Sequence, residues 1–209
     1  MKRYSSSQKT CPGFEGITLG EEIEAYGVVK VVASDNVEFE KGDVVVGVVT
    51  WAEYSKIRRN GMIMKLNPLG FPLSYHLGVL GYSGLTAYAG FFEICKLKRG
   101  EMVFVLTASG SVGNLVGQYA RLHRCFVAGY AGSKRRVQLL KEKLGFDAAF
   151  NYREETDLSS TLKSSGIPDE IDIYFETMGI VMQEVTVTNV NTFGRVAMCG
   201  VISEYTDSE

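Results

Sequence analysis

The sequence predicts an α/β fold with a doubly wound parallel sheet in its second half, preceded by a smaller antiparallel β region. After Gly100, short apolar segments of buried-strand type alternate with amphipathic segments of helix length in five successive units. A turn containing glycine separates the first of these strands from its helix. Because strands that alternate with helices pair in parallel through right-handed crossovers, the five units predict one sheet.

The first part of the chain has a different pattern. Residues Tyr26–Ala33 and Val44–Thr50 are rich in valine, and a polar turn containing Lys41-Gly42-Asp43 separates them. This pattern is typical of antiparallel strands in a small β-barrel or sandwich. Residues 75–95 are expected to contain helical segments that join the two regions. We therefore expect a β domain in residues 1–72 and an α/β domain in residues 73–209.

The second half of the sequence predicts two helices and five strands. A helix with apolar residues on one face is expected over Ser111–Arg124, and a second helix ends at Gly145, which suits a left-handed C-terminal turn. The expected strands are Met102–Thr107, Cys125–Tyr130, Ala148–Asn151, Ile171–Phe175 and Arg195–Cys199.

The turn after the first strand is the strongest functional motif. It reads Ala108-Ser109-Gly110-Ser111-Val112-Gly113, between a strand and a helix. A glycine turn in this position lets the backbone approach a pyrophosphate, whose charge the first helical amides and the helix dipole then stabilise. The motif therefore predicts dinucleotide binding.

The end of the second strand indicates which dinucleotide is bound. An NAD-binding fold usually has an acidic residue there, whereas this chain reads Gly132-Ser133-Lys134-Arg135-Arg136. A cation attracts a 2′-phosphate that a carboxylate would repel, so the expected cofactor is NADP(H), held by Lys134. The alternative is that the three cations are solvated residues of a helix's first turn, and for Arg135 and Arg136 the two interpretations stay open.

Ligands of such sheets bind beyond the carboxyl ends of the strands. We expect one crevice to be formed by the residues at those ends, which are Ser109 and Gly110, Ala131 to Lys134, Tyr152, Glu176 and Thr177, and Gly200 to Ser203.

Composition excludes several function classes. The net charge of −2 gives no general attraction to nucleic acid or to an anionic membrane. No apolar run reaches transmembrane length and no signal-peptide pattern is present, so a cytoplasmic location is the default expectation.

The four cysteines are widely spaced and there are two histidines, so no metal site is expected. Cys125 and Cys199 are interpreted as small core residues of buried strands.

Several motifs together carry a family resemblance. They are Trp51-Ala52-Glu53-Tyr54-Ser55, Gly84-Leu85-Thr86-Ala87-Tyr88, Ala108 to Gly113, Ala131-Gly132-Ser133-Lys134, Phe150-Asn151-Tyr152, Asp172-Ile173-Tyr174-Phe175-Glu176 and Cys199 to Tyr205. From about Tyr26 to Tyr205 the chain resembles the zinc-free medium-chain dehydrogenases/reductases, specifically the plant NADP-dependent alkenal double-bond reductases related to prostaglandin reductase.

The resemblance implies a Rossmann domain, a partial GroES-like β-barrel before it, and a homodimer. It implies hydride transfer from NADPH to the β-carbon of an α,β-unsaturated aldehyde or ketone, with Tyr205 as the catalytic residue beside the substrate. It places Thr86 near the nicotinamide, and Lys134 and Tyr152 at the adenosine phosphate. The expected cofactor-binding residues are Thr86, Ala108, Ser109, Gly110, Ser111, Val112, Gly113, Gly132, Ser133, Lys134, Tyr152, Glu176, Gly200, Ile202 and Ser203.

The chain also departs from the family pattern. It is expected to be truncated at both ends, without the family's Cys-Asp-Pro-Tyr-Met segment and its late Asn-Val-Gly motif. Ser83 stands where proline is usual, and Thr177-Met178 where Asn-Val is usual. Two alternatives to alkenal reduction therefore stay open: a catalytically silent fragment that keeps cofactor binding, and a zinc-free quinone reductase.

Overall fold

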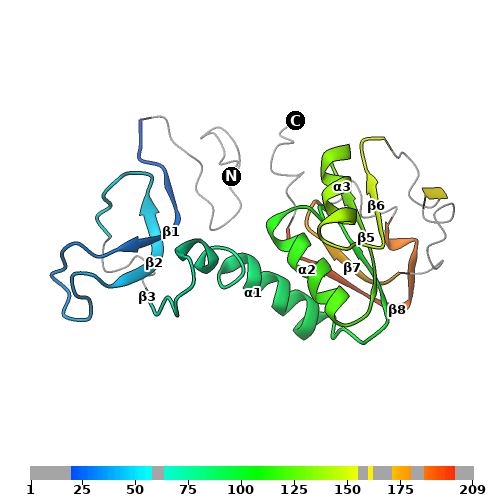
Figure 1. Ribbon diagram of the computed structural model, residues 1–209, viewed down its shortest axis with the longest axis horizontal. Helices are drawn as coiled ribbons and strands as arrows, with labels where there is room; N and C mark the ends of the chain where they lie inside the picture. The colour runs from blue at the N-terminus through cyan, green and yellow to red at the C-terminus, as the bar shows by residue number, and fades with distance from the viewer. Residues whose placement is uncertain (1–19, 58–63, 155–159, 162–170, 180–185, 201–209) are drawn as a thin grey trace. The chain divides into compact units, whose positions relative to one another are not determined.

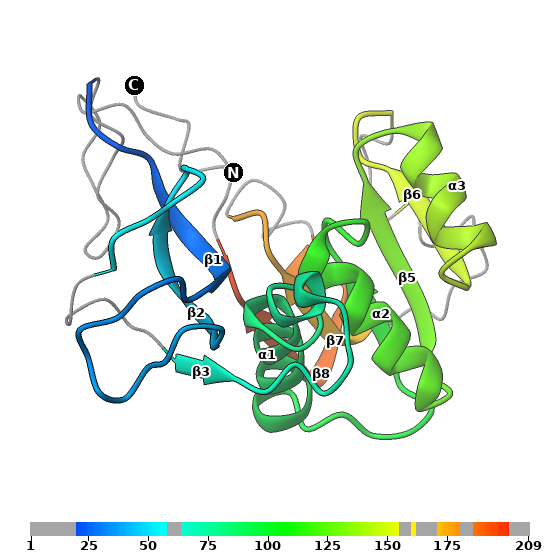
Figure 2. The same cartoon turned by 60° about the vertical axis from the view of Figure 1, so that its left-hand side comes forward.

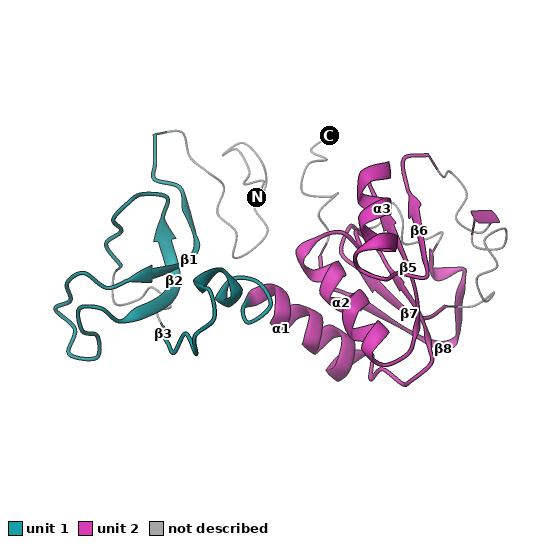
Figure 3. Ribbon diagram, viewed as in Figure 1, with its two compact units in different colours: residues 1–81 teal, residues 82–209 magenta. Residues whose placement is uncertain are grey.

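A computed structural model of the chain describes residues 20–57, 64–154, 160–161, 171–179 and 186–200. The chain forms two compact units, residues 1–81 and 82–209 (Figure 3). The first unit includes the short 3₁₀ helix η1 (Leu73–His76), and the expected division into domains at residue 72 stays a prediction. The buried His76 ring lies 3.4 Å from the carbonyl oxygen of Pro68, which ties η1 to the segment before it.

The first unit contains an antiparallel sheet of three strands in the order β1-β2-β3. These strands are β1 (Glu24–Lys30), β2 (Val44–Thr50) and β3 (Met64–Leu66). The central strand β2 buries Val45, Val46 and Val49, which explains why its valine-rich sequence forms a strand. The predicted antiparallel strands are confirmed. Strand β3 was not predicted, because three residues are too few to form a recognisable pattern. Closure into a barrel stays a prediction.

The second unit contains a parallel sheet of five strands in the order β6-β5-β4-β7-β8 (Figures 1 and 2). Its strands are β4 (Met102–Val105), β5 (Phe126–Ala131), β6 (Ala148–Asn151), β7 (Ile171–Glu176) and β8 (Val190–Met198). All four pairs of neighbouring strands are parallel. The first strand of the unit, β4, is central. The next two strands, β5 and β6, lie on one side of it, and β7 and β8 lie on the other. This is the predicted Rossmann topology.

Alternating side chains give the sheet two apolar faces. Val103 and Val105 of β4 belong to the core cluster that contains Val116 of helix α2 (Ser111–Leu122) and Leu140 of helix α3 (Lys134–Glu142). Phe104 points to the other face, where its ring meets that of Tyr130 edge to face, with centroids 5.3 Å apart. Because both faces are buried, the strands read as nearly continuous apolar runs in the sequence.

The first helical segment of the second unit also packs on the face that carries α2. It comprises α1 (Tyr82–Tyr88) and the π-helical turn η2 (Ala89–Ile94), whose Phe91 is fully buried in the same core cluster. A Cβ atom at Gly90 would lie 2.9 Å from the ring of Phe175, so only glycine lets η2 approach the sheet this closely.

Some element ends differ from those expected. Helix α2 ends at Leu122 rather than Arg124, because Arg124 has a left-handed φ of 58°. Strand β4 ends at Val105 rather than Thr107, whose φ is 46°. Strand β8 begins at Val190, five residues before the expected Arg195.

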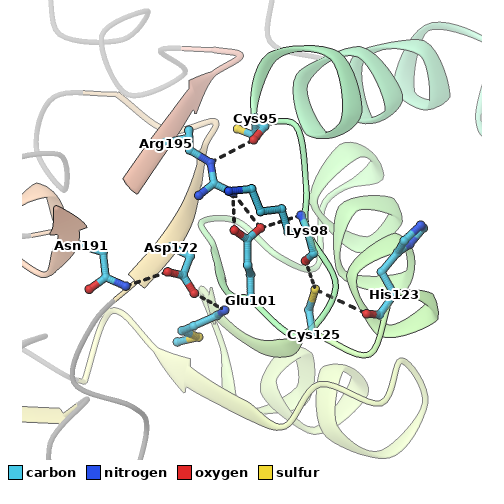
Figure 4. Close-up of polar contacts among 9 residues, drawn as sticks. Cys95, Lys98, Glu101, His123, Cys125, Asp172, Asn191 and Arg195 are labelled. Carbon is cyan, nitrogen blue, oxygen red and sulfur yellow. Dashed lines mark hydrogen bonds and ion pairs between the residues drawn. The ribbon is translucent and has the colours of Figure 1, made fainter. Parts of the chain in front are cut away.

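A network of polar contacts around one ion pair links β8 with the segments at the starts of β4 and β7 (Figure 4). Arg195 of β8 donates from Nη2 to both carboxylate oxygens of Glu101, each at 2.7 Å, and from Nε to the carbonyl oxygen of Cys95 at 3.0 Å. Nearby, Asp172 accepts bonds from the amide of Met102 at 2.8 Å and from the side chain of Asn191 at 2.7 Å. The network connects η2, β4, β7 and β8 away from the carboxyl ends of the strands.

Candidate functional site

The parallel sheet brings most of the predicted site residues to one edge. Five segments follow the carboxyl ends of the strands, namely Thr107–Gly110 after β4, Gly132–Lys134 after β5, Tyr152 after β6, Thr177 after β7 and Gly200 after β8. The strand order reverses between β4 and β7, and ligands of open α/β sheets bind outside the carboxyl ends at such a point. Tyr205, Ile202 and Ser203 lie outside the described residues.

The glycine turn begins helix α2 as predicted. Gly110 is the N-cap residue, with an extended backbone (φ −76°, ψ 171°) and no side-chain capping bond. Its amide donates to the carbonyl oxygen of Thr107 at 2.8 Å, which closes the turn. Because no side chain caps the helix and its first turn has no acidic residue, the first amides and the positive end of the helix dipole can stabilise an anion.

Two further glycines let the turn sit this close to the sheet. A Cβ atom at Gly113 would lie 2.7 Å from the carbonyl oxygen of Thr107 and 3.0 Å from the Cα of Ala108. A Cβ atom at Gly129 in β5 would lie 2.6 Å from the Cβ of the fully buried Ala108. The glycine motif marks Gly113 in the sequence. No local pattern marks Gly129, because its contact with Ala108 depends on the pairing of β4 and β5.

The basic cluster begins helix α3. Ser133 is the N-cap residue, and its carbonyl oxygen accepts the amides of Arg136 and Val137, both at 3.0 Å. Lys134, Arg135 and Arg136 are exposed, and the first turn contains no acidic residue. The Nζ of Lys134 lies 3.7 Å from Glu154, and with 84% of the side chain exposed this ion pair is weak. The ammonium group is therefore available to a phosphate.

Tyr152 covers the turn that precedes α3. A Cβ atom at Gly132 would lie 2.7 Å from the hydroxyl oxygen of Tyr152, so the absence of a side chain at Gly132 makes room for that hydroxyl. The amide of Tyr152 donates to the carbonyl oxygen of Ala131 at 3.2 Å, and the guanidinium of Arg153 lies 5.9 Å from the centre of the tyrosine ring. The structure thus brings Tyr152 against Gly132, two residues before Lys134, and the contact of Lys134 and Tyr152 with a cofactor phosphate stays a prediction.

Glu176 ends strand β7 and is fully buried. Its carboxylate accepts bonds from the hydroxyl of Tyr174, from the amide of Met178 and, at 3.1 Å, from the amide of Gly179. Burial raises the pKa of this carboxyl, and the backbone amides partly oppose the shift. In the structure Glu176 holds the loop that follows β7, and its direct contact with a cofactor stays a prediction.

Thr86 is half-buried on α1, in the same unit as the turn, and its place beside a nicotinamide stays a prediction.

Cys95 and Cys125 are buried, and burial raises the pKa of the Cys95 thiol to about 11, which disfavours a thiolate nucleophile. Cys199 is exposed, contrary to expectation, because it follows the end of edge strand β8.

Within the described part of the chain, no group of three or more histidine, cysteine, aspartate or glutamate side chains could hold a metal ion. In the same part, no helix is both long and apolar enough to span a membrane. The expectation of a zinc-free protein rests on the sequence and stays a prediction.

Comparison with known proteins agrees with this geometry. The family described as zinc-binding dehydrogenase matches residues 111–208, which contain the helices α2 and α3 and the strands β5 to β8. Over 191 residues the chain is 51% identical to the 2-alkenal reductase (NADP(+)-dependent) of Nicotiana tabacum, with 91% of this chain and 55% of the relative covered. The chain belongs to the medium-chain dehydrogenase/reductase family.

Two further members support the assignment. The (+)-pulegone reductase of Mentha piperita is 49% identical over 195 residues, which are 93% of this chain and 57% of the relative. The crystal structure of CurA from Vibrio vulnificus in complex with NADPH superposes with a TM-score of 0.81 at 33% identity, covering 96% of this chain and 59% of CurA. This medium-chain dehydrogenase/reductase chain therefore spans a little more than half the length of these relatives.

Proposed function

We propose that this chain is an NADPH-dependent reductase that reduces the carbon–carbon double bond of α,β-unsaturated aldehydes and ketones. The observation that carries the proposal is the likeness to the tobacco 2-alkenal reductase, which extends over most of the chain. The described site adds a glycine turn, a basic helix start and a covering tyrosine at the same edge of the sheet.

The residues present fit NADPH. The uncapped start of α2 suits a pyrophosphate, because no side chain occupies its first amides and Gly113 lets the helix start lie against the carbonyl oxygen of Thr107. The exposed ammonium of Lys134 suits a 2′-phosphate. When bound, NADPH supplies the hydride for the β-carbon of the substrate.

The substrate side of the proposal comes from the resemblance. Tyr205 is proposed to donate a hydrogen bond to the substrate's carbonyl oxygen, where negative charge develops as the β-carbon is reduced. Thr86 is proposed to lie beside the nicotinamide. A homodimer and a cytoplasmic location belong to the same proposal, and they rest on the resemblance and on the sequence composition respectively.

Product analysis tests the proposal. The chain is incubated with NADPH and 2-hexenal, and the products are separated and identified by mass spectrometry and NMR. The expected product is the saturated aldehyde, whereas an allylic alcohol would contradict conjugate reduction. The Tyr205→Phe variant should lower turnover more than affinity for NADPH.

Two other outcomes would favour the alternatives left open by the sequence. Tight NADPH binding without turnover of any enal or enone would indicate a silent cofactor-binding chain. Turnover of 1,4-benzoquinone but not of 2-hexenal would indicate a quinone reductase.

A further inference from the structure

Thr107 adopts an unusual backbone conformation at the start of the glycine turn. Its φ is 46°, in the left-handed region that a β-branched residue seldom adopts. In this conformation its carbonyl oxygen accepts the amide of Gly110 at 2.8 Å and lies where Gly113 leaves room for it. The conformation of Thr107 thus determines where helix α2 begins. Unfavourable conformations of this kind persist only where the surrounding structure fixes them.

A hydroxyl pair fixes Thr107 from the neighbouring strand. The ladder between β4 and β7 continues past β4, because the amide of Leu106 donates to the carbonyl oxygen of Phe175 at 3.0 Å. The hydroxyl of Thr177 then donates to the carbonyl oxygen of Leu106 at 3.2 Å, and it is also hydrogen-bonded to the hydroxyl of Thr107. A hydroxyl has one proton to donate. Because Thr177 donates its proton to the carbonyl oxygen of Leu106, Thr107 must be the donor in the bond between the two hydroxyls.

Thr177 is itself held on two sides. The residue before it, Glu176, accepts the amides of Met178 and Gly179, which fixes the loop after β7. A Cβ atom at Gly200 would lie 3.3 Å from the carbonyl oxygen of Thr177, so the segment after β8 packs against Thr177 as well. Thr177 therefore connects the loops that follow β4, β7 and β8, at the point where the strand order reverses.

We propose that Thr107 and Thr177 are positioning residues, whose hydroxyl pair holds the glycine turn so that the first amides of α2 face the cofactor pyrophosphate. The inference rests on the proposed function and adds to it the part of the cofactor that depends on this pair. The hydroxyls act through the backbone rather than by touching the phosphates, since both of their protons are already donated within the protein.

The experiment compares two ligands that share the adenosine end. NADPH contains the pyrophosphate, whereas adenosine 2′-monophosphate carries the 2′-phosphate but no phosphate at the 5′ position. Dissociation constants for both are measured by calorimetry with the unaltered 209-residue chain and with the variant Thr177→Val, which keeps the side-chain shape but removes the hydroxyl. Thr177→Ser restores a hydroxyl and is the matched control.

Removal of the Thr177 hydroxyl, which takes part in two neutral hydrogen bonds, should weaken NADPH binding about 2- to 10-fold in Thr177→Val. Binding of adenosine 2′-monophosphate should change less than about twofold, and Thr177→Ser should bind NADPH like the unaltered chain. Unchanged NADPH binding in Thr177→Val, or equal weakening for both ligands, would overturn the inference while the proposed function stands. Failure of the unaltered chain to bind NADPH would overturn the proposed function as well.

Discussion

Replacing Gly132 by alanine should weaken NADPH binding by displacing Tyr152. The new Cβ atom would lie 2.7 Å from the hydroxyl oxygen of Tyr152 and 3.1 Å from its Cζ, both closer than van der Waals contact allows. Gly132 is not among the glycines with positive φ, so its backbone accepts an alanine and the effect is steric. Either the tyrosine ring or the turn before α3 must move.

The size of the effect follows from the packing around this contact. Overpacking of a closed interior costs about 1–3 kcal/mol. Gly132 and Tyr152 are only half-buried, so the ring can shift toward solvent and the lower end of that range applies. Because the displaced ring must return to its original position when NADPH binds, this cost of about 1 kcal/mol falls on binding and corresponds to about a fivefold increase in the dissociation constant.

A double-mutant cycle tests whether the contact causes the loss. NADPH affinity is measured by fluorescence titration for Gly132→Ala, for Tyr152→Phe and for the combined variant. Phenylalanine lacks the oxygen that makes the closest contact, so the combined variant should bind more tightly than the two separate losses would predict. If the losses add within about 0.5 kcal/mol, the two positions are independent and the steric reasoning is wrong.

Three further predictions concern charged side chains. Lys134→Ala should weaken NADPH binding by about 1–3 kcal/mol and leave NADH binding nearly unchanged, and equal losses in titrations with both cofactors would contradict the 2′-phosphate assignment. Burial raises the pKa of Glu176 above its ordinary value of 4.5, so the folded chain binds this proton more tightly than the unfolded chain does. The protonated Glu176 therefore adds to the free energy of unfolding at low pH, and this contribution is lost as pH rises through the pKa of the folded state. In Glu176→Gln, urea titrations should show a smaller fall of the free energy of unfolding over that pH range. An unchanged pH dependence would refute this role of Glu176. Arg195→Met leaves the carboxylate of Glu101 without its cation and should lower the free energy of unfolding by about 2–3 kcal/mol, less than for a fully buried pair; an unchanged urea midpoint would show that the pair adds no stability.

The sequence by itself determined the order of elements and the place of the site. Apolar runs and a helical stripe are local patterns, so they identified the strands from β4 to β8 and the helix α2 with small errors at their ends. Parallel pairing then places every strand end at one edge, which is why residues as distant as Gly110 and Tyr152 could be assigned to one crevice. The cluster from Gly132 to Lys134 was also recognisable from the sequence, because its basic residues, and the lack of an acidic residue at the end of the preceding strand, are local features.

Only the tertiary structure decided which side chains hold that edge together. The Thr107–Thr177 pair joins residues 70 positions apart, and no local pattern marks either threonine as a partner of the other. Arg195 and Glu101 are separated by 94 positions, and their ion pair depends on the placement of β8 beside β7. The left-handed conformation of Thr107, which ended β4 early, is also a tertiary effect, since local propensity disfavours it for a β-branched residue. Local sequence sets where strands and turns form, whereas contacts across the sheet set the conformations of individual residues, because those contacts outweigh the local preference.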